Sequence, residues 1–64
     1  MTTDELIVAL GNKFAALVKY NNKSGTIYYQ SESIFLDGGQ HFCFWGDTPK
    51  EAMQKLYNAL KKLE

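Results

Sequence analysis

The sequence of 64 residues predicts one α+β domain over residues 1–64. Its expected order is a helix, a small antiparallel sheet of two or three strands, and a second helix, with the helices on one face of the sheet. Three observations predict this order. Apolar residues recur at helical spacing near both ends of the chain. Two stretches between them are rich in β-branched and aromatic residues. Short segments containing glycine separate the stretches.

The C-terminal helix is predicted by "GDTPKEAMQKLYNALKKLE". Thr48 suits the N-cap, and Pro49 suits the first helical position, where its missing N–H has no intrahelical partner to lose. Glu51 follows Thr48 by three residues and would complete a capping box. One apolar stripe then follows, formed by Met53, Leu56, Leu60 and Leu63.

The N-terminal helix has a clear start and an ambiguous end. Thr2 or Thr3 can cap it, and acidic residues follow in the first turn. Its apolar stripe would be Ile7, Leu10, Phe14 and Leu17. This unbroken spacing favours a helix that runs to about Tyr20 and stops at "NNKSG". Alternatively, "Gly11-Asn12" closes a short helix at Leu10 and leaves "FAALVKY" as a strand.

The middle of the chain predicts strands at "TIYYQSESIFL" and "QHFCFW", joined by a hairpin turn at Asp37-Gly38-Gly39. Strand side chains alternate between faces. In the second strand Phe42 and Phe44 should share one face, and His41, Cys43 and Trp45 the other. Regular pairing divides the first strand into Tyr29, Ser31, Ser33 and Phe35 on one face, and Tyr28, Gln30, Glu32, Ile34 and Leu36 on the other.

A chain of this length buries only about 60% of the surface that its unfolded form exposes, so it needs further stabilisation. Cys43 is the single cysteine, which excludes an intrachain disulfide and favours a reducing compartment. Together with His41 it supplies fewer ligands than the four positions of a structural zinc site. We therefore expect no metal or other cofactor. A second copy of the chain or a partner protein remains as the source of stabilisation.

The charges make nucleic acid a less favoured partner. Seven acidic residues balance seven basic ones, and all the basic residues are lysine. Arginine is the usual side chain for bidentate contacts to phosphates and bases. The order helix, strands, helix is nevertheless the broad order of the double-stranded-RNA-binding fold, and aromatic strands can stack bases. Nucleic-acid binding through aromatic strands and lysines therefore stays as the alternative.

The location is predicted to be cytoplasmic, in a bacterium or an infected host cell. No apolar run approaches the roughly 20 residues of a membrane span, so no membrane partner is expected. The acidic N-terminus is unlike a signal peptide.

The candidate functional residues are the aromatic residues of the strands and their neighbours. Two helices can cover only one face of so small a sheet. However, neither face of the predicted strands has the polar side chains expected of a face in contact with water. Exposed apolar patches mark interaction sites, and Trp and Tyr are frequent interface anchors. We expect a partner-binding or dimer interface formed by Tyr20, Tyr28, Tyr29, His41, Cys43 and Trp45. The alternative is an aromatic-rich core in which Trp45 folds over an edge of the sheet.

Catalysis is not expected. His41 and Cys43 should share a strand face, where an imidazole and a thiol could act as base and nucleophile. Such chemistry also needs an orienting group, an oxyanion site and a cleft. So short a chain offers little to build them, and we predict no enzyme, no catalytic residue and no small-molecule substrate.

"GDTPKEAMQKLYNAL", Gly46 to Leu60, resembles the strand-to-helix junction of HicB-type antitoxins, which reads Gly-Asp-Thr before a Glu-Ala-rich helix. Those small α+β proteins bind and block a toxin ribonuclease, so the resemblance implies toxin neutralisation. In size and composition the chain also looks like small accessory proteins of phages and mobile elements. Our hypothesis is a non-catalytic protein-binding module, an inhibitor or adaptor that covers a surface; a phage-encoded inhibitor of a host defence system would be one such module.

Overall fold

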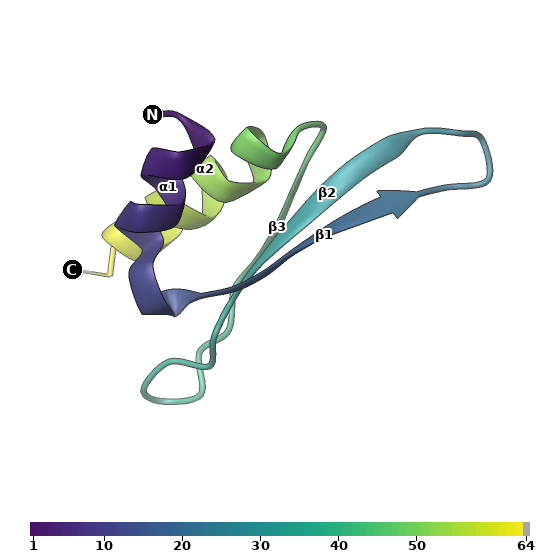
Figure 1. Ribbon diagram of the computed structural model, residues 1–64. Coiled ribbons are helices and arrows are strands. Elements are labelled where there is room, and N and C mark those ends of the chain that lie inside the picture. Colours follow the sequence, from purple (N-terminus) through teal and green to yellow (C-terminus); the bar gives the residue numbers. More distant parts are fainter. Residues whose placement is uncertain (64) are drawn as a thin grey trace.

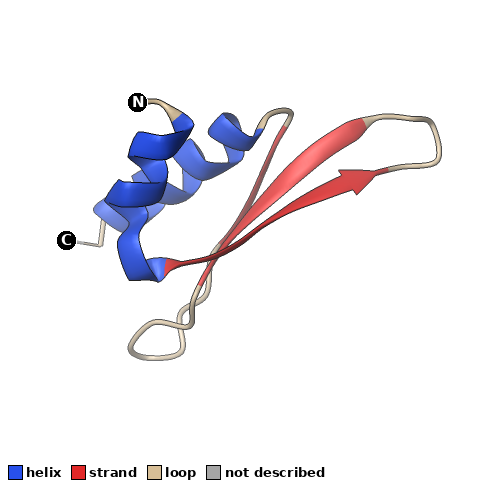
Figure 2. Ribbon diagram, in the orientation of Figure 1, coloured by secondary structure: helices blue, strands red, loops and turns tan. Residues whose placement is uncertain are grey.

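The computed structural model describes residues 1–63 and has the predicted α+β architecture with three strands. The elements are α1 (Thr3–Leu10), a 3₁₀ turn (Gly11–Lys13), β1 (Phe14–Asn21), β2 (Ile27–Ser33), β3 (Cys43–Gly46) and α2 (Pro49–Lys61). The strands form one antiparallel sheet in the order β1-β2-β3. Both helices lie on the same side of the sheet, and the β1–β2 hairpin extends beyond them (Figures 1 and 2).

The first helix is shorter than its apolar spacing favours, so the prediction of a helix to about Tyr20 is wrong. α1 ends at Leu10, and Gly11 follows with a φ of +58°, a conformation that favours glycine. The alternative prediction, a strand over "FAALVKY", is confirmed by β1. The reason is long-range: β1 pairs with β2 from Phe14, opposite Ser33, to Asn21, opposite Ile27. A helix over the same residues would leave β2 at an unpaired sheet edge.

The core lies between the helices and the sheet. Its buried residues are Leu6, Leu10, Met53, Leu56 and Leu60, and the partly buried residues against it are Phe14, Leu17, Leu36, Phe42, Phe44 and Tyr57. Two residues predicted for the apolar stripes are exposed instead, Ile7 on α1 and Leu63 beyond the end of α2. Because α1 is short, the face that it buries centres on Leu6 and Leu10.

α2 begins at the predicted cap, with one difference in detail. The Thr48 Oγ1 accepts a hydrogen bond from the Glu51 N–H at 3.1 Å, and Pro49 is the first helical residue. The Glu51 carboxylate accepts from the Asp47 N–H at 3.1 Å, one residue before the cap. The reciprocal half of the predicted capping box is thus displaced by one residue.

The alternation predicted for the first strand holds through Ser33 and then fails. The buried Ser33 Oγ accepts a hydrogen bond from the Phe42 N–H at 3.0 Å and donates one to the Ile34 carbonyl at 2.9 Å. This side chain takes the place of a regular ladder contact, and β2 ends at Ser33. Leu36 then packs against the core, while Phe35 is 74% exposed. The faces predicted for these last two residues are therefore wrong.

The two predicted turns are confirmed. Gly38 and Gly39 have φ values of +84° and +79°, and the Leu36 N–H donates to the Gln40 carbonyl across the turn at 2.8 Å. In the "NNKSG" turn the Asn22 Oδ1 accepts hydrogen bonds from the backbone N–H groups of Ser24 and Thr26.

Candidate functional site

The face of the sheet that lies away from the helices is the candidate site. Residues opposite one another in an antiparallel pair share a face, so the register places Val18, Gln30 and Trp45 in one row across the sheet. Tyr20 and Tyr28 form the next row. We call the following set the open face: Ala16, Val18, Tyr20, Tyr28, Gln30, Glu32, Cys43 and Trp45.

Small side chains on the other face explain why α2 covers that face. Ser31 is fully buried, and its Oγ donates a hydrogen bond to the Ala52 carbonyl of α2 at 2.7 Å. A Cβ on the buried Gly46 would lie 2.7 Å from the Ala52 nitrogen and 2.8 Å from the Glu51 Cβ. The helix therefore lies close against β2 and β3. Sequence reasoning missed this role, although small residues at alternate positions of β2 are a readable signal.

The two tyrosines of the open face are held in place by each other and by a neighbour. The Tyr20 and Tyr28 rings are stacked, with centroids 5.2 Å apart and planes 12° from parallel. The Tyr20 hydroxyl donates a hydrogen bond to the Gln30 Oε1 at 2.8 Å. Tyr20 is still 38% exposed. Side chains ordered before binding lose less rotamer entropy when a partner docks.

Trp45 is the most exposed aromatic side chain of the open face, at 54%. Its backbone is tied to the helix layer, because the Lys55 Nζ donates a hydrogen bond to the Trp45 carbonyl at 2.8 Å. Lys55 also lies 3.4 Å from the Glu51 carboxylate. Both charged side chains are about half exposed, so this ion pair adds little stability. Its effect is to hold β3 against α2 while the indole projects from the opposite face.

Tyr29 does not join the other predicted site residues. It lies opposite Gly46 and Lys19, two residues from the buried Ser31, and therefore on the helix side of the sheet. Both Tyr28 and Tyr29 were predicted for the interface, but neighbouring residues of a strand lie on opposite faces, and the register puts Tyr29 on the helix side. The open face takes Tyr28.

His41 lies just before β3 and extends the open face at its edge. The His41 Nδ1 is 3.8 Å from the Cys43 Sγ, which confirms the predicted shared face. The Phe35 ring stacks on the imidazole, with centroids 4.7 Å apart and planes 23° from parallel. His41 is exposed and Cys43 is half-buried. The imidazole is therefore stacked on an aromatic neighbour although the residue is exposed.

The charge of the open face is sparse and negative. Of its eight residues only Glu32 is charged, and none is lysine. Lys19 lies opposite Tyr29 on the helix side, and Lys23 lies in the hairpin turn. A surface of this kind suits an apolar partner better than a polyphosphate.

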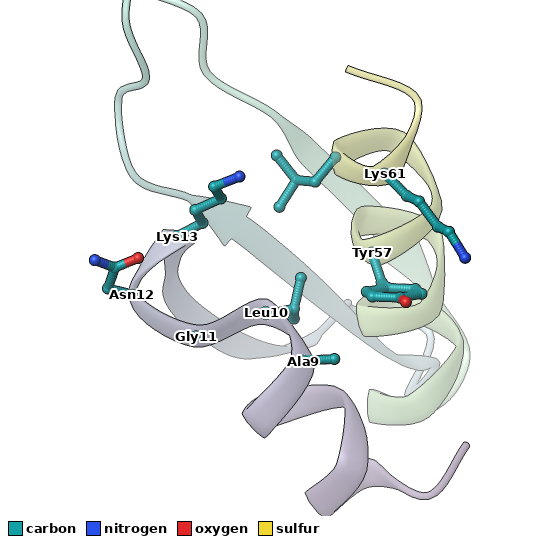
Figure 3. Close-up of a pocket in the computed structure, with 8 residues that line it drawn as sticks. Ala9, Leu10, Gly11, Asn12, Lys13, Tyr57 and Lys61 are labelled. Carbon is teal, nitrogen blue, oxygen red and sulfur yellow. The ribbon is translucent and has the colours of Figure 1, made fainter. Parts of the chain in front are cut away.

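A hollow lies elsewhere, between the end of α1 and the end of α2 (Figure 3). It has a volume of about 500 Å³ and is lined by Ala9, Leu10, Gly11, Asn12, Lys13, Tyr57, Leu60 and Lys61. The Lys61 Nζ lies 5.8 Å from the centre of the Tyr57 ring. None of the residues predicted for the site lines this hollow, so the Cys43–His41 pair does not face it.

Within residues 1–63 no helix has both the length and the apolar character needed to cross a membrane. In the same part of the chain no three His, Cys, Asp or Glu side chains are grouped as metal ligands.

No family model, no curated protein and no solved structure matches this chain. Its own geometry is therefore the basis for interpreting the site.

Proposed function

We propose that this protein is a non-catalytic protein-binding module that covers part of a partner protein's surface with its open face. One observation carries the proposal: within residues 1–63 both helices lie on the same side of the sheet, so Tyr20, Tyr28 and Trp45 stand on a side without a covering helix. Exposed aromatic patches of this kind are typical of interaction sites.

The anchors are also of the residue types that stabilise protein interfaces most strongly. Trp and Tyr dominate the binding energy of many protein interfaces, and removing one such anchor costs about 2 kcal/mol or more. The stacked tyrosines and the bond to Gln30 support the proposal, because a fixed surface loses little side-chain entropy on docking. The bond from Lys55 to the Trp45 carbonyl fixes the strand that presents the indole.

Nucleic-acid binding is the second candidate. The order of the elements and the aromatic strands favour it, because exposed rings can stack bases. The charges oppose it, because phosphate contacts supply most of the affinity for nucleic acids and the open face has no lysine. Lys55, which lies near Trp45, is already bonded to the Trp45 carbonyl and paired with Glu51.

Several forms of protein binding are consistent with the proposal. The segment that resembles the HicB-type junction runs from Gly46, the end of β3, into α2, next to Trp45. Neutralisation of a toxin would be one way of covering a partner's surface, and inhibition of a host defence complex another. The single cysteine fits action in the reducing cytoplasm. Pairing of two copies through their open faces is a further form.

The test compares Trp45→Ser and Tyr20→Ser with a matched control, Val8→Ser, on the outer side of α1, where the side chain is 80% exposed. Self-association is measured by light scattering over a dilution series with EDTA present, and partner capture by using each variant as bait in a bacterial lysate. Loss of one anchor should weaken binding about 30-fold, the equivalent of 2 kcal/mol. The control should bind like the parent.

Two outcomes would count against the proposal. If both open-face variants bind like the parent, the site is elsewhere. If capture survives the variants but disappears between low and moderate salt, a phosphate-bearing partner is indicated instead, because an apolar interface responds little to salt. Unfolding curves for each variant show whether a loss of binding is merely a loss of fold.

A further inference from the structure

We propose that His41 and Cys43 form half of a zinc site, which a second copy of the chain completes with the same two residues. The site would be a tetrahedral Cys₂His₂ site with one Zn²⁺ for two chains. Cys43 belongs to the open face, but this inference does not depend on the proposed function, because the metal ligands are Cys43 and His41 and not the rings of Tyr20, Tyr28 and Trp45.

The distance between the two side chains carries the inference. The His41 Nδ1 and the Cys43 Sγ are 3.8 Å apart. Two ligands of one tetrahedral Zn²⁺, at about 2.3 Å for sulfur and about 2.0–2.1 Å for nitrogen, lie about 3.6 Å from each other. The pair therefore needs a shift of only a few tenths of an ångström to chelate one ion. The Phe35 ring also stacks on the imidazole, with centroids 4.7 Å apart.

The number of ligands requires a second chain. His41 is the only histidine and Cys43 the only cysteine of the sequence. In residues 1–63 no third His, Cys, Asp or Glu is placed with them to form a metal site. Structural zinc sites have four protein ligands, so one chain supplies half of a site. A two-fold axis beside the pair would supply the other half, because a symmetric pair of chains repeats the same residues.

The position of the pair leaves room for that second chain. β3 is an edge strand of the sheet, and His41 lies just before its first residue. The imidazole is exposed and the thiol half-buried. Glu32 lies opposite Cys43 and adds the one negative charge of the open face near the ion. A cation is thus favoured here, and the edge offers access from solvent.

The binding step is a simple exchange of protons for a metal ion. Each Cys43 thiol loses its proton to the solvent, and each sulfur and each His41 Nδ1 donates one electron pair to Zn²⁺. The imidazole proton then resides on Nε2. Two thiolates balance the charge of the ion, and no oxidant or reductant takes part. The ion would stabilise this small domain by linking two chains, as a disulfide stabilises many small secreted proteins.

The experiment titrates the full chain with ZnCl₂ and with CoCl₂, in a buffer whose phosphine reductant prevents a disulfide between chains. Light scattering reports the mass and cobalt absorption the geometry. We expect the mass to double as half an equivalent of metal is added, together with thiolate charge-transfer and intense tetrahedral cobalt bands. EDTA should restore the starting mass. Cys43→Ser and His41→Asn should each abolish these changes, and the second is at an exposed position where folding is not at risk.

Two variants serve as controls. Glu32→Gln should still bind one metal per two chains, because the carboxylate is not one of the four ligands. Trp45→Ser should bind metal like the parent, which separates this site from the proposed function. The inference is overturned if micromolar metal leaves the mass unchanged, if one metal binds per monomer, if Glu32→Gln abolishes binding, or if Cys43→Ser still pairs on addition of zinc.

Discussion

Replacing Gly46 by alanine tests the close approach of α2 to the sheet. Gly46 is buried and lies where β3 passes under the first turn of α2. Its φ is not in the left-handed region, so the backbone itself accepts alanine. The added Cβ, however, would lie 2.7 Å from the Ala52 nitrogen and 2.8 Å from the Glu51 Cβ. A rotamer change cannot relieve contacts with a backbone atom and a Cβ, so α2 has to move.

The expected cost follows from these contacts. Overpacking by one methyl group costs about 1–3 kcal/mol, and a clash with helix backbone belongs near the upper end. Alanine gains back about 0.4–1 kcal/mol by restricting the unfolded chain. The net loss is about 2 kcal/mol. A domain of this size has only about 3–5 kcal/mol of stability. At a urea dependence of about 1 kcal/mol per molar, the midpoint should fall by about 2 M.

The assay is urea unfolding followed by the fluorescence of Trp45, the only tryptophan. Ser31→Ala provides an internal check, because the Ser31 bond to the Ala52 carbonyl spans the same contact between helix and sheet. Its cost of about 1 kcal/mol in the parent should largely vanish when Gly46→Ala is already present. An unchanged or raised midpoint for Gly46→Ala would refute the reasoning, since a glycine in open space with ordinary φ would give that result.

Three further predictions concern local contacts. Ser33→Ala leaves the Phe42 N–H without its acceptor and should cost about 1–3 kcal/mol in urea unfolding. Thr48→Ala removes the cap of α2 and should cost about 1 kcal/mol, a fall in Tm of about 4–8 °C by circular dichroism. The Thr2 backbone N–H donates a hydrogen bond to the Glu5 carboxylate and lowers the pKa of Glu5. This contribution to stability is present above the unfolded pKa of about 4.3 and is lost as the pH falls through the lower folded value, so Glu5→Gln should flatten the acid side of a stability–pH curve.

The proposed zinc site and the open face predict different results in the same dilution experiments. Self-association that needs metal and survives Trp45→Ser belongs to the edge of β3. Self-association that persists in EDTA and is lost in Trp45→Ser belongs to the open face. A chain that is monomeric under both conditions leaves the open face free for another protein, and the capture experiment then becomes decisive.

Local signals in the sequence predicted several elements correctly. The Thr48 cap, Pro49 and the apolar stripe of α2 act within a few turns of one helix, and both turns depend on their own glycine and asparagine residues. The alternation that puts Cys43 and Trp45 on one side is likewise a property of one strand, and His41 lies near Cys43 just before that strand. The sequence alone therefore predicted these features, and most of the residues of the candidate site.

Other features depend on contacts between residues that are distant in the sequence. The apolar spacing from Ile7 to Leu17 fits a helix, but pairing with β2 makes Phe14–Asn21 a strand. Tyr28 and Tyr29 are neighbours of similar chemistry, and only the register with β1 and β3 assigns Tyr28 to the open face. The small residues Ser31 and Gly46 let α2 lie against β2 and β3. The covered face, and hence the open one, is therefore set by contacts between elements, which no local pattern encodes.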